Sequence, residues 1–200
     1  MNNSSLKQEL TSLLKDRFSL SQSTRANYAR GEDTYDPILS QAVVFPETNE
    51  EVSGILKLCN DHKVPVVPFG TGTSLEGNVV GNDKGITISL EKMDKILSVN
   101  VSDFDCRVQA NVTREKLNEY LREDGVFFPI DPGANAAIGG MASTSASGTM
   151  SVKYGTMKTV ITGLTVVLPS GEIIKTGSRT KKTSAGYNLT NLFIGSEGTL

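Results

Sequence analysis

A glycine-rich segment at residues 68–77 carries the first residues whose types and spacing could do chemistry. Gly70, Thr71 and Gly72 follow directly on a strand-like run that ends at Pro68. Glycine lets backbone amides approach an anion closely, and threonine and serine side chains add hydroxyl donors. The pattern therefore predicts a cradle for a diphosphate.

Two common phosphate-binding patterns do not fit this segment. A dinucleotide fingerprint needs G-x-G-x-x-G at the start of a helix, but the residues here continue to Gly77, Gly81 and Gly85, a stretch that will not hold a helix. Glu91 stands about 20 residues after Gly70, like the ribose-binding carboxylate of that fingerprint, yet the match loses its meaning without the helix. A P-loop needs Gly-Lys-Ser/Thr, which is missing. We therefore reject both interpretations.

A second segment, residues 131–148, is poor in charge and in bulky side chains. It is too apolar for a flexible linker and too small for an ordinary core, so we expect another body to lie against it, and a flat ring system would fit. The alternative is close packing of backbone without a ligand. A third segment, residues 187–200, ends in a small-residue turn that carries Glu197. Such a turn could meet a ribose or a ring edge, or simply join two elements.

The composition is that of an ordinary globular protein. The 200 residues are 38% hydrophobic and 21% charged, with a formal net charge of -2. Because a nucleic-acid binder needs a basic excess, we expect no nucleic-acid partner. No apolar run reaches the roughly 18 residues of a membrane span. The polar start at Met1 to Ser5 lacks the order of a signal peptide, so a cytoplasmic location is expected.

The cysteines and the histidine give no sign of a metal site. Cys59 and Cys106 lie in unrelated patterns, which do not support a disulfide or a CxxC metal knuckle, and we expect two buried free thiols. His62 is the only histidine and falls just past a predicted helix, beside Asp61 and Lys63. We expect a solvated helix end rather than a catalytic base.

Three amphipathic helices are expected from the spacing of apolar residues. The first covers residues 4–18, and the second is capped by Thr48. The third covers residues 113–122, with Tyr120 facing inward beside two leucines. The polar stretch 19–39, between the first two helices, predicts a connecting loop.

Short runs of branched residues predict strands between these helices. The predicted strands cover residues 42–45, 64–68, 86–90, 96–99, 106–110, 164–168 and 172–176. Pro169-Ser170-Gly171 separates the last two and predicts a hairpin turn. The chain is therefore expected to mix helix and strand in an α+β fold.

Three motifs, taken together, point to a known family. They are Pro68 to Ser74; Asp131-Pro132-Gly133 with Ile138-Gly139-Gly140 and Ala146-Ser147-Gly148; and Gly195 to Leu200. In this order and spacing they resemble the FAD-linked oxidases of the vanillyl-alcohol oxidase type. Within that superfamily the sequence is most similar to flavoprotein D-lactate dehydrogenases and to the flavin subunit of glycolate oxidase. The resemblance covers residues 43–200 and implies a PCMH-type FAD-binding domain of two α+β subdomains, with FAD between them.

The resemblance also implies which residues contact FAD. The first loop would hold the diphosphate, the second would line the flavin and its ribityl chain, and Glu197 to Leu200 would contribute the last loop. The implied cofactor-binding residues are Pro68, Phe69, Gly70, Thr71, Gly72, Thr73, Ser74, Asp131, Pro132, Gly133, Ala134, Ile138, Gly139, Ser145, Ala146, Ser147, Gly148, Glu197 and Gly198. Relatives that tether FAD covalently often carry histidine in the first loop, where this sequence has threonine, and Cys106 matches no attachment motif. We therefore expect noncovalent FAD.

The activity that the resemblance implies is oxidation of a small D-2-hydroxy acid, D-lactate or glycolate, by hydride transfer to flavin N5. A quinone, a cytochrome or an electron-transfer flavoprotein would then take the electrons. The expected location is the cytoplasm, with peripheral attachment to the inner membrane as the alternative. The alternatives are an alkyl-glycerone-phosphate synthase or a sugar oxidase on the same fold, and an inactive, truncated flavin-binding fragment.

The resemblance divides the chain at residue 40, into an N-terminal helix with a connecting segment (1–40) and the FAD-binding domain (41–200). In the family the third motif continues into an apolar strand, so we expect the front part of a longer protein, truncated before the end of this domain and without its substrate domain. No catalytic base can be assigned for that reason. Arg30, Lys153 and Tyr154 are candidates for lining the site, with surface or packing roles as the alternative.

Overall fold

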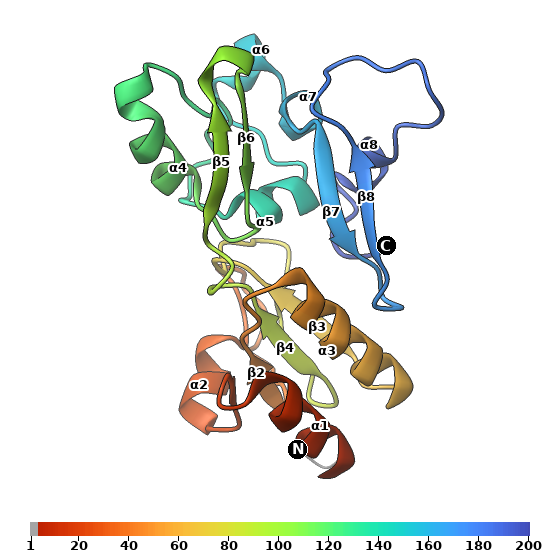
Figure 1. Ribbon diagram of the computed structural model, residues 1–200. Helices are drawn as coiled ribbons and strands as arrows, with labels where there is room; N and C mark the ends of the chain where they lie inside the picture. The colour runs from red at the N-terminus through yellow and green to blue at the C-terminus, as the bar shows by residue number, and fades with distance from the viewer. Residues whose placement is uncertain (1–3) are drawn as a thin grey trace. The chain divides into compact units, whose positions relative to one another are not determined.

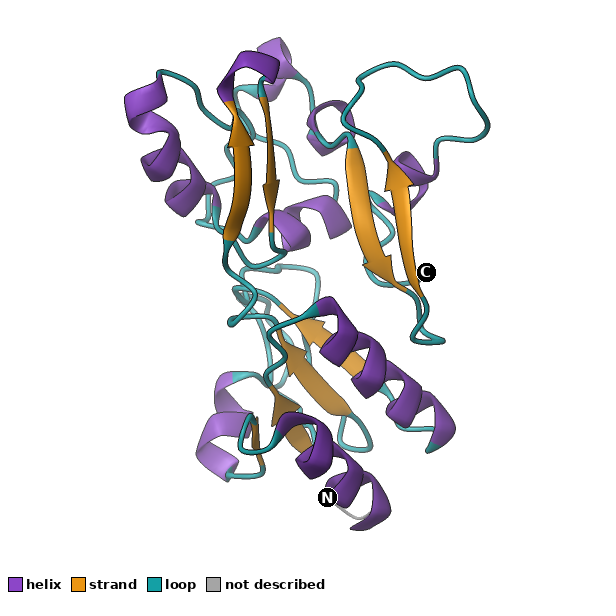
Figure 2. Cartoon of the chain, in the orientation of Figure 1, coloured by secondary structure: helices purple, strands orange, loops and turns teal. Residues whose placement is uncertain are grey.

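The computed structural model describes residues 4–200, and residues 1–3, at the start of the predicted N-terminal segment, lie outside the described residues. The chain divides into two compact units. Unit 1 comprises Met1–Lys92 with Val167–Ile173, and unit 2 comprises Met93–Val166 with Ile174–Leu200. Each unit mixes helices and strands, as predicted (Figure 2). The predicted domain boundary at residue 40 lies within unit 1 and stays a prediction.

Unit 1 is built on a four-stranded sheet of order β1-β2-β4-β3. β1 (Phe18–Ser19) runs antiparallel to β2 (Ala42–Val44). β2, β4 (Ile86–Ser89) and β3 (Val66–Phe69) are parallel to one another. Because parallel strands share their direction, the segments that follow β3 and β4 leave from the same edge of the sheet.

Two helices pack side by side and on this sheet (Figure 1). They are α1 (Ser4–Leu14) and α3 (Asn49–Asp61). Their buried apolar side chains are Leu6, Leu10, Leu14, Ile55 and Cys59. Thr48 caps α3 as predicted, its hydroxyl accepting a hydrogen bond of 3.2 Å from the amide three residues on. α1 is shorter than predicted, because Lys15 adopts a left-handed φ of 59° and Phe18 enters β1 instead.

Residues 19–39 are not a continuous loop. α2 (Gln22–Asn27) begins after Ser21, whose hydroxyl accepts a hydrogen bond of 3.2 Å from the amide of Thr24. The helix buries no side chain, so it lacks the apolar spacing from which helices are predicted. The predicted loop is therefore wrong over α2.

Two further strand pairs follow the sheet of unit 1 along the chain. β5 (Ile96–Asn100) pairs antiparallel with β6 (Asp105–Val108). β7 (Gly163–Val167) pairs with β8 (Ile173–Gly177) around the predicted turn. The tip of this second hairpin belongs to unit 1, where the Ser53 hydroxyl on α3 donates a hydrogen bond of 2.5 Å to the carbonyl of Gly171.

The helices of unit 2 are short. They are α4 (Arg114–Leu121), α5 (Ile138–Ser143), α6 (Ser151–Tyr154), α7 (Met157–Val160) and α8 (Leu189–Phe193), with 3-10 turns at Val101–Asp103 and Arg122–Asp124. Thr113 caps α4 as predicted. The unit 2 core gathers residues of α4, α5 and α7 with Val112, Ile130 and Ile194.

Two predictions of burial in unit 2 are wrong. Tyr120 is 60% exposed, because the buried side of α4 consists of Leu117 and Leu121, four residues apart on one helix face. Cys106 is an exposed free thiol, because β6 lies in a two-stranded ladder. Cys59 is buried, as predicted.

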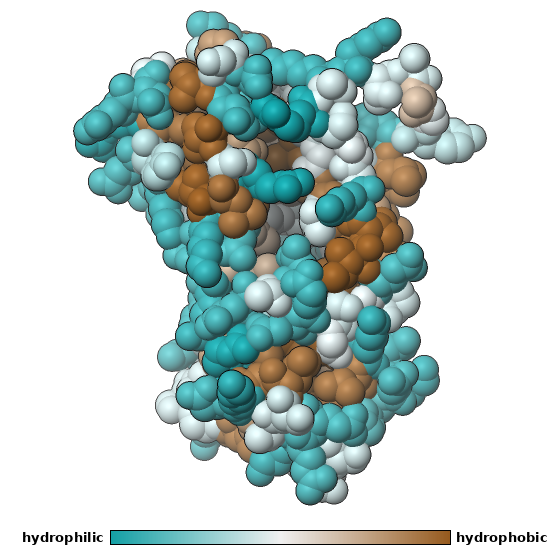
Figure 3. All heavy atoms as spheres, viewed as in Figure 1, coloured by the Kyte–Doolittle hydropathy of each residue, from teal (hydrophilic) through white to brown (hydrophobic). Residues whose placement is uncertain are grey.

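Hydrophilic residues, in teal, cover much of the face drawn in Figure 3, with brown hydrophobic patches between them. Exposed apolar and aromatic side chains include Phe104, Val152 and Tyr187. Among residues 4–200, no helix is long and apolar enough to cross a membrane.

Candidate functional site

The first predicted loop, Pro68 to Ser74, leaves the carboxyl end of β3. Phe69 anchors it: the side chain is 6% exposed, and the Phe69 carbonyl accepts a hydrogen bond of 2.9 Å from the amide of Leu90. The chain then turns at Gly72, where φ is 74°. A side chain at this position would meet the Phe69 ring, which fills the inside of the turn. Glycine at position 72 therefore allows both the left-handed turn and the close approach of the ring.

The hydroxyls of this loop make hydrogen bonds, whereas several of its backbone amides do not. Thr71 and Thr73 place their Oγ1 atoms 3.3 Å apart, and the Ser74 hydroxyl donates a hydrogen bond of 2.5 Å to the Asn78 side chain. The amides of Gly72, Thr73 and Ser74 donate no hydrogen bond to any group in residues 4–200. Successive amides of this kind favour an anionic ligand.

Aromatic rings support the base of the loop. The Tyr28 ring meets the rings of Phe69 and Phe45 edge to face, with centroid distances of 5.0 and 5.8 Å. The Tyr28 hydroxyl donates a hydrogen bond to the carboxylate of Glu91. Burial, together with this carboxylate, raises the pKa of Tyr28 to about 12. Glu91 therefore helps to hold the Tyr28 ring in this cluster.

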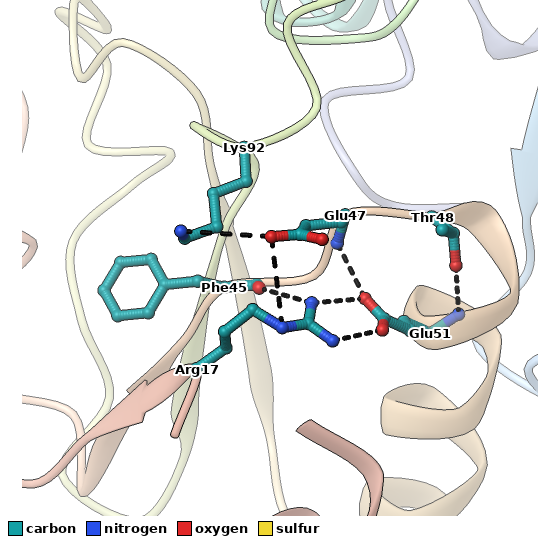
Figure 4. A network of polar contacts seen from close by, with 6 residues as sticks. All are labelled: Arg17, Phe45, Glu47, Thr48, Glu51 and Lys92. Carbon is teal, nitrogen blue, oxygen red and sulfur yellow. Dashed lines mark hydrogen bonds and ion pairs between the residues drawn. The ribbon is translucent and has the colours of Figure 1, made fainter. Parts of the chain in front are cut away.

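Figure 4 shows an ion-pair network at the start of α3 in unit 1. Arg17 donates two hydrogen bonds to the carboxylate of Glu51 and one of 3.2 Å to the carbonyl of Phe45. Glu47 lies 3.9 Å from the ammonium of Lys92. The Arg17 guanidinium holds the pKa of Glu51 down at about 2. This arginine is thus committed to holding β1 against α3.

The two ends of the second predicted loop are tied together in unit 2. The Asp131 carboxylate accepts hydrogen bonds of 2.7 Å from the Thr149 hydroxyl and 3.0 Å from the Met150 amide. These two bonds hold the pKa of Asp131 below its usual range. A side chain at Gly148 would clash with the carboxylate and the carbonyl of Asp131. The close approach explains the glycine at position 148.

Between these ends the chain forms α5, a helix that the sequence analysis missed. Gly139 lies against Ala110: its amide donates a hydrogen bond of 2.8 Å to the Ala110 carbonyl, and a Cβ on Gly139 would lie 2.8 Å from that oxygen. Ile138 is 6% exposed, so it packs in the core. By contrast, a Cβ added at Gly133 or Gly140 would meet nothing within 4 Å. One side of the segment is therefore closed by packing, and glycines leave open space elsewhere along it.

The third predicted loop lies against the second. The amide of Gly195 donates a hydrogen bond of 3.0 Å to the carbonyl of Ala142, and the amide of Glu197 donates one of 3.0 Å to that of Ser143. A Cβ on Gly195 would lie 3.1 Å from the Cβ of Ser145. The structure therefore brings the second and third motifs together within unit 2. The sequence separates them by about fifty positions and could not show this.

The remaining predicted site residues have other surroundings. Arg30 is exposed. The Lys153 ammonium lies 5.0 Å from the centre of the Tyr154 ring, which meets Phe127 edge to face at 5.5 Å. The ring of His62, at the C-terminal cap of α3, lies 3.0 Å from the Glu9 carboxylate on α1. No cluster of three or more His, Cys, Asp or Glu side chains suited to a metal occurs among residues 4–200.

Known proteins resemble this chain over most of its length. A family model described as FAD binding domain matches residues 40–177. The probable mitochondrial D-lactate dehydrogenase of Danio rerio is 49% identical over 185 residues, which are 91% of this chain and 37% of that protein. The mitochondrial D-lactate dehydrogenase (cytochrome) 1 of Saccharomyces cerevisiae is 51% identical over 161 residues, 79% of this chain and 27% of that protein. The glycolate oxidase subunit GlcD of Bacillus subtilis is 37% identical over 164 residues, 81% of this chain and 35% of that protein.

Solved structures share the fold. An alkyldihydroxyacetonephosphate synthase matches with a TM-score of 0.88 at 23% identity, covering 100% of this chain and 39% of that one. The p-cresol methylhydroxylase with substrate bound matches with a TM-score of 0.78 at 24% identity, covering 95% of this chain and 40% of that one. The predicted PCMH-type FAD-binding fold is confirmed. The chain spans only about a third of the length of the curated relatives reported above.

Proposed function

Because this chain belongs to the FAD-binding domain family, we propose that its three glycine-rich loops hold FAD noncovalently, and that the whole protein oxidises a small D-2-hydroxy acid. The run of amides at Gly72, Thr73 and Ser74, with no acceptor among the described residues, is the observation that carries the cofactor assignment. The names of the relatives, D-lactate dehydrogenases and a glycolate oxidase subunit, support D-lactate or glycolate as substrate.

The first loop suits a diphosphate. Its amides follow one another at the carboxyl edge of a parallel sheet, where α/β proteins commonly bind ligands. Hydrogen bonds from such amides to a charged oxygen are about twice as strong as those to a neutral acceptor. In the proposal, Pro68 to Ser74 therefore hold the diphosphate of FAD.

The second and third loops suit the flavin. The open space at Gly133 and Gly140 would let a flat ring approach the backbone. In the proposal, the segments 131–137 and 145–148 line the flavin and its ribityl chain, and Glu197 and Gly198 add the last loop. Close packing of Gly139 on Ala110 and of Gly148 on Asp131 would hold these segments in position.

Noncovalent binding is supported by the absence of a suitable attachment residue in these loops. None of the three motifs contains histidine or cysteine. The single histidine pairs with Glu9, and Cys59 is a buried residue of α3. Precipitating the native protein with acid should therefore release the flavin into the supernatant. A yellow pellet would contradict noncovalent binding.

Bound FAD would supply the hydride acceptor for oxidation of the hydroxyl carbon. The residues of this chain would hold and orient it. Two arginines of this chain are engaged elsewhere: Arg17 is paired with Glu51, and Arg179 is paired with Asp103 and Asp105.

Flavin bleaching tests the proposal. Native protein should be yellow, and under anaerobic conditions D-lactate or glycolate should bleach it while L-lactate, the matched control, bleaches it far more slowly. Reoxidation by a quinone, cytochrome c or an electron-transfer flavoprotein would then identify the acceptor, and cell fractionation would test for peripheral attachment to a membrane. A pure, colourless protein that takes up no added FAD would contradict the proposal. Bleaching by a sugar but by no 2-hydroxy acid would support the proposed cofactor and contradict the proposed substrate.

A further inference from the structure

A segment that the sequence analysis treated as a connecting loop lies directly behind the first loop of unit 1. A Cβ added to Gly31 would lie 2.7 Å from the carbonyl oxygen of Ser74 and 2.9 Å from that of Gly72. Real side chains essentially never approach backbone this closely. The present position of the loop therefore requires glycine at position 31.

This contact fixes the direction of two peptide groups. In a trans peptide the C=O and the N–H point in opposite directions, and the described residues contain no cis peptide. Because the carbonyls of Gly72 and Ser74 face Gly31, the amides of Thr73 and Leu75 in the same peptide groups face away from it. Neither amide donates a hydrogen bond within residues 4–200. Gly31 thus lies on the carbonyl side of two peptide groups whose amides, those of Thr73 and Leu75, point away from it.

Gly31 is itself held in place. The carboxylate of Asp33, only 8% exposed, accepts hydrogen bonds of 3.0 Å from the amides of Gly31 and Tyr35. On the preceding side, the carbonyl of Ala29 accepts a hydrogen bond of 2.9 Å from the amide of Gly81. The support behind the loop is therefore anchored on both sides of Gly31.

We infer that Gly31, held by Asp33, is a positioning residue that sets the affinity of the first loop for a diphosphate. This inference rests on the proposed function, because the diphosphate is that of FAD. Neither residue touches the ligand. A side chain at position 31 would push the carbonyls of Gly72 and Ser74 forward and turn the amides of Thr73 and Leu75 away from the anion.

A matched pair of variants tests this inference. Gly31→Ala places a methyl group against the carbonyls behind the loop. Gly85→Ala makes a similar clash in the same unit, 2.6 Å from the carbonyl of Pro65, but at the opposite end of β4. The dissociation constant of FAD is measured by fluorescence titration of the flavin-stripped protein, and the thermal midpoint by circular dichroism. Gly31→Ala should weaken FAD binding by about ten- to a hundredfold, the loss of one or two hydrogen bonds to a charged group. Gly85→Ala should lower the midpoint with little change in the dissociation constant.

Each other outcome has a definite meaning. Equal losses of affinity in the two variants, or unchanged affinity in Gly31→Ala, would overturn the inference while the proposed function stands. Failure of the unsubstituted protein to bind FAD would overturn both. If Gly31→Ala does not fold, Asp33→Ala and Asp33→Asn replace it. Asp33→Ala should weaken FAD binding, and Asp33→Asn, which keeps one acceptor oxygen, should recover part of the loss; equal affinities in both variants and the unsubstituted protein would overturn the inference.

Discussion

Arg17 and Glu51 form a two-pronged ion pair that joins β1 to the first turn of α3. The side chains are only 20% and 19% exposed, so water screens them weakly. The Glu51 carboxylate also accepts a hydrogen bond of 2.7 Å from the Glu47 amide. The pair therefore ties the residue before β1 to the segment that connects β2 with α3.

This pair makes stability depend on pH. The Arg17 guanidinium first, and then the backbone amide of Glu47, lower the pKa of Glu51 from 4.5 to about 2. A carboxylate with a lowered folded-state pKa stabilises the fold fully above its unfolded pKa and loses that effect as the pH falls toward the folded value. Glu51→Gln should cost about 2 kcal/mol at neutral pH and almost nothing near pH 2. Denaturant unfolding at several pH values measures this, with the exposed Glu50→Gln as control; a cost that stays constant between pH 7 and 2 would refute it.

Two adjacent glycines of α5 should respond in opposite ways. Gly139→Ala would force a methyl group against Ala110 and should destabilise the protein by about 1–3 kcal/mol. Gly140→Ala enters open space and should leave stability unchanged or improve it by up to about 1 kcal/mol, the helix preference of alanine. If a flavin lies at this open side, Gly140→Ala should nevertheless weaken FAD uptake. Thermal melts and flavin titration separate the two effects, and equal destabilisation by both variants would contradict the packing described.

The two hydrogen bonds that the half-buried Asp131 accepts should matter for FAD binding. Asp131→Ala removes the acceptor of the Thr149 hydroxyl and the Met150 amide, so the second loop should loosen and hold FAD about three- to tenfold more weakly. Asp131→Asn keeps one acceptor oxygen and should lose less. Flavin titration of both variants provides the measurement. Identical affinities for all three proteins would show that these hydrogen bonds have no role in binding.

Arg179 should restrain the long exposed segment that follows β8. Its guanidinium lies 2.5 Å from the Asp103 carboxylate and 2.8 Å from that of Asp105, while residues 177–189 are all exposed. Arg179→Ala should speed tryptic cleavage after Lys181 and Lys182 by about two- to fivefold, in line with exposed ion pairs. High salt should bring the unsubstituted protein toward the same rate. Arg122→Ala, another exposed arginine of unit 2, is the control, and an unchanged rate in Arg179→Ala would rule out the restraint.

The parts that sequence predicted well are those with a local signal. Thr48 and Thr113 each precede an apolar stripe at helical spacing, and Pro169 to Gly171 has the chemistry of a tight turn. α2 was missed because it buries no side chain. α5 was missed because it is only six residues long and holds two glycines, so its buried residues Ile138, Met141 and Ala142 give a weak signal, and close contact of Gly139 with Ala110 helps to hold it. That contact joins residues far apart along the chain, which periodicity cannot reveal.

The candidate site shows the same limit. The three motifs were visible as glycine-rich runs, and the resemblance gave their order a meaning. The role of Gly31 was not visible, because its glycine is explained only by carbonyls more than forty residues further along. Likewise, the bonds from Gly195 to Ala142 and from Glu197 to Ser143 arise from folding alone.

The two cysteines differ sharply in accessibility, so their rates of chemical modification report on the opening of the fold. Cys59 is 1% exposed, and burial raises its pKa to about 12, so its thiol is protected while α3 stays packed on the sheet. Cys106 is exposed on β6, although local desolvation and the neighbouring Asp105 raise its pKa too. A thiol reagent should therefore modify one cysteine in the native protein and the second only when unit 1 opens. The lag between the two events measures how often that unit unfolds, without any introduced probe.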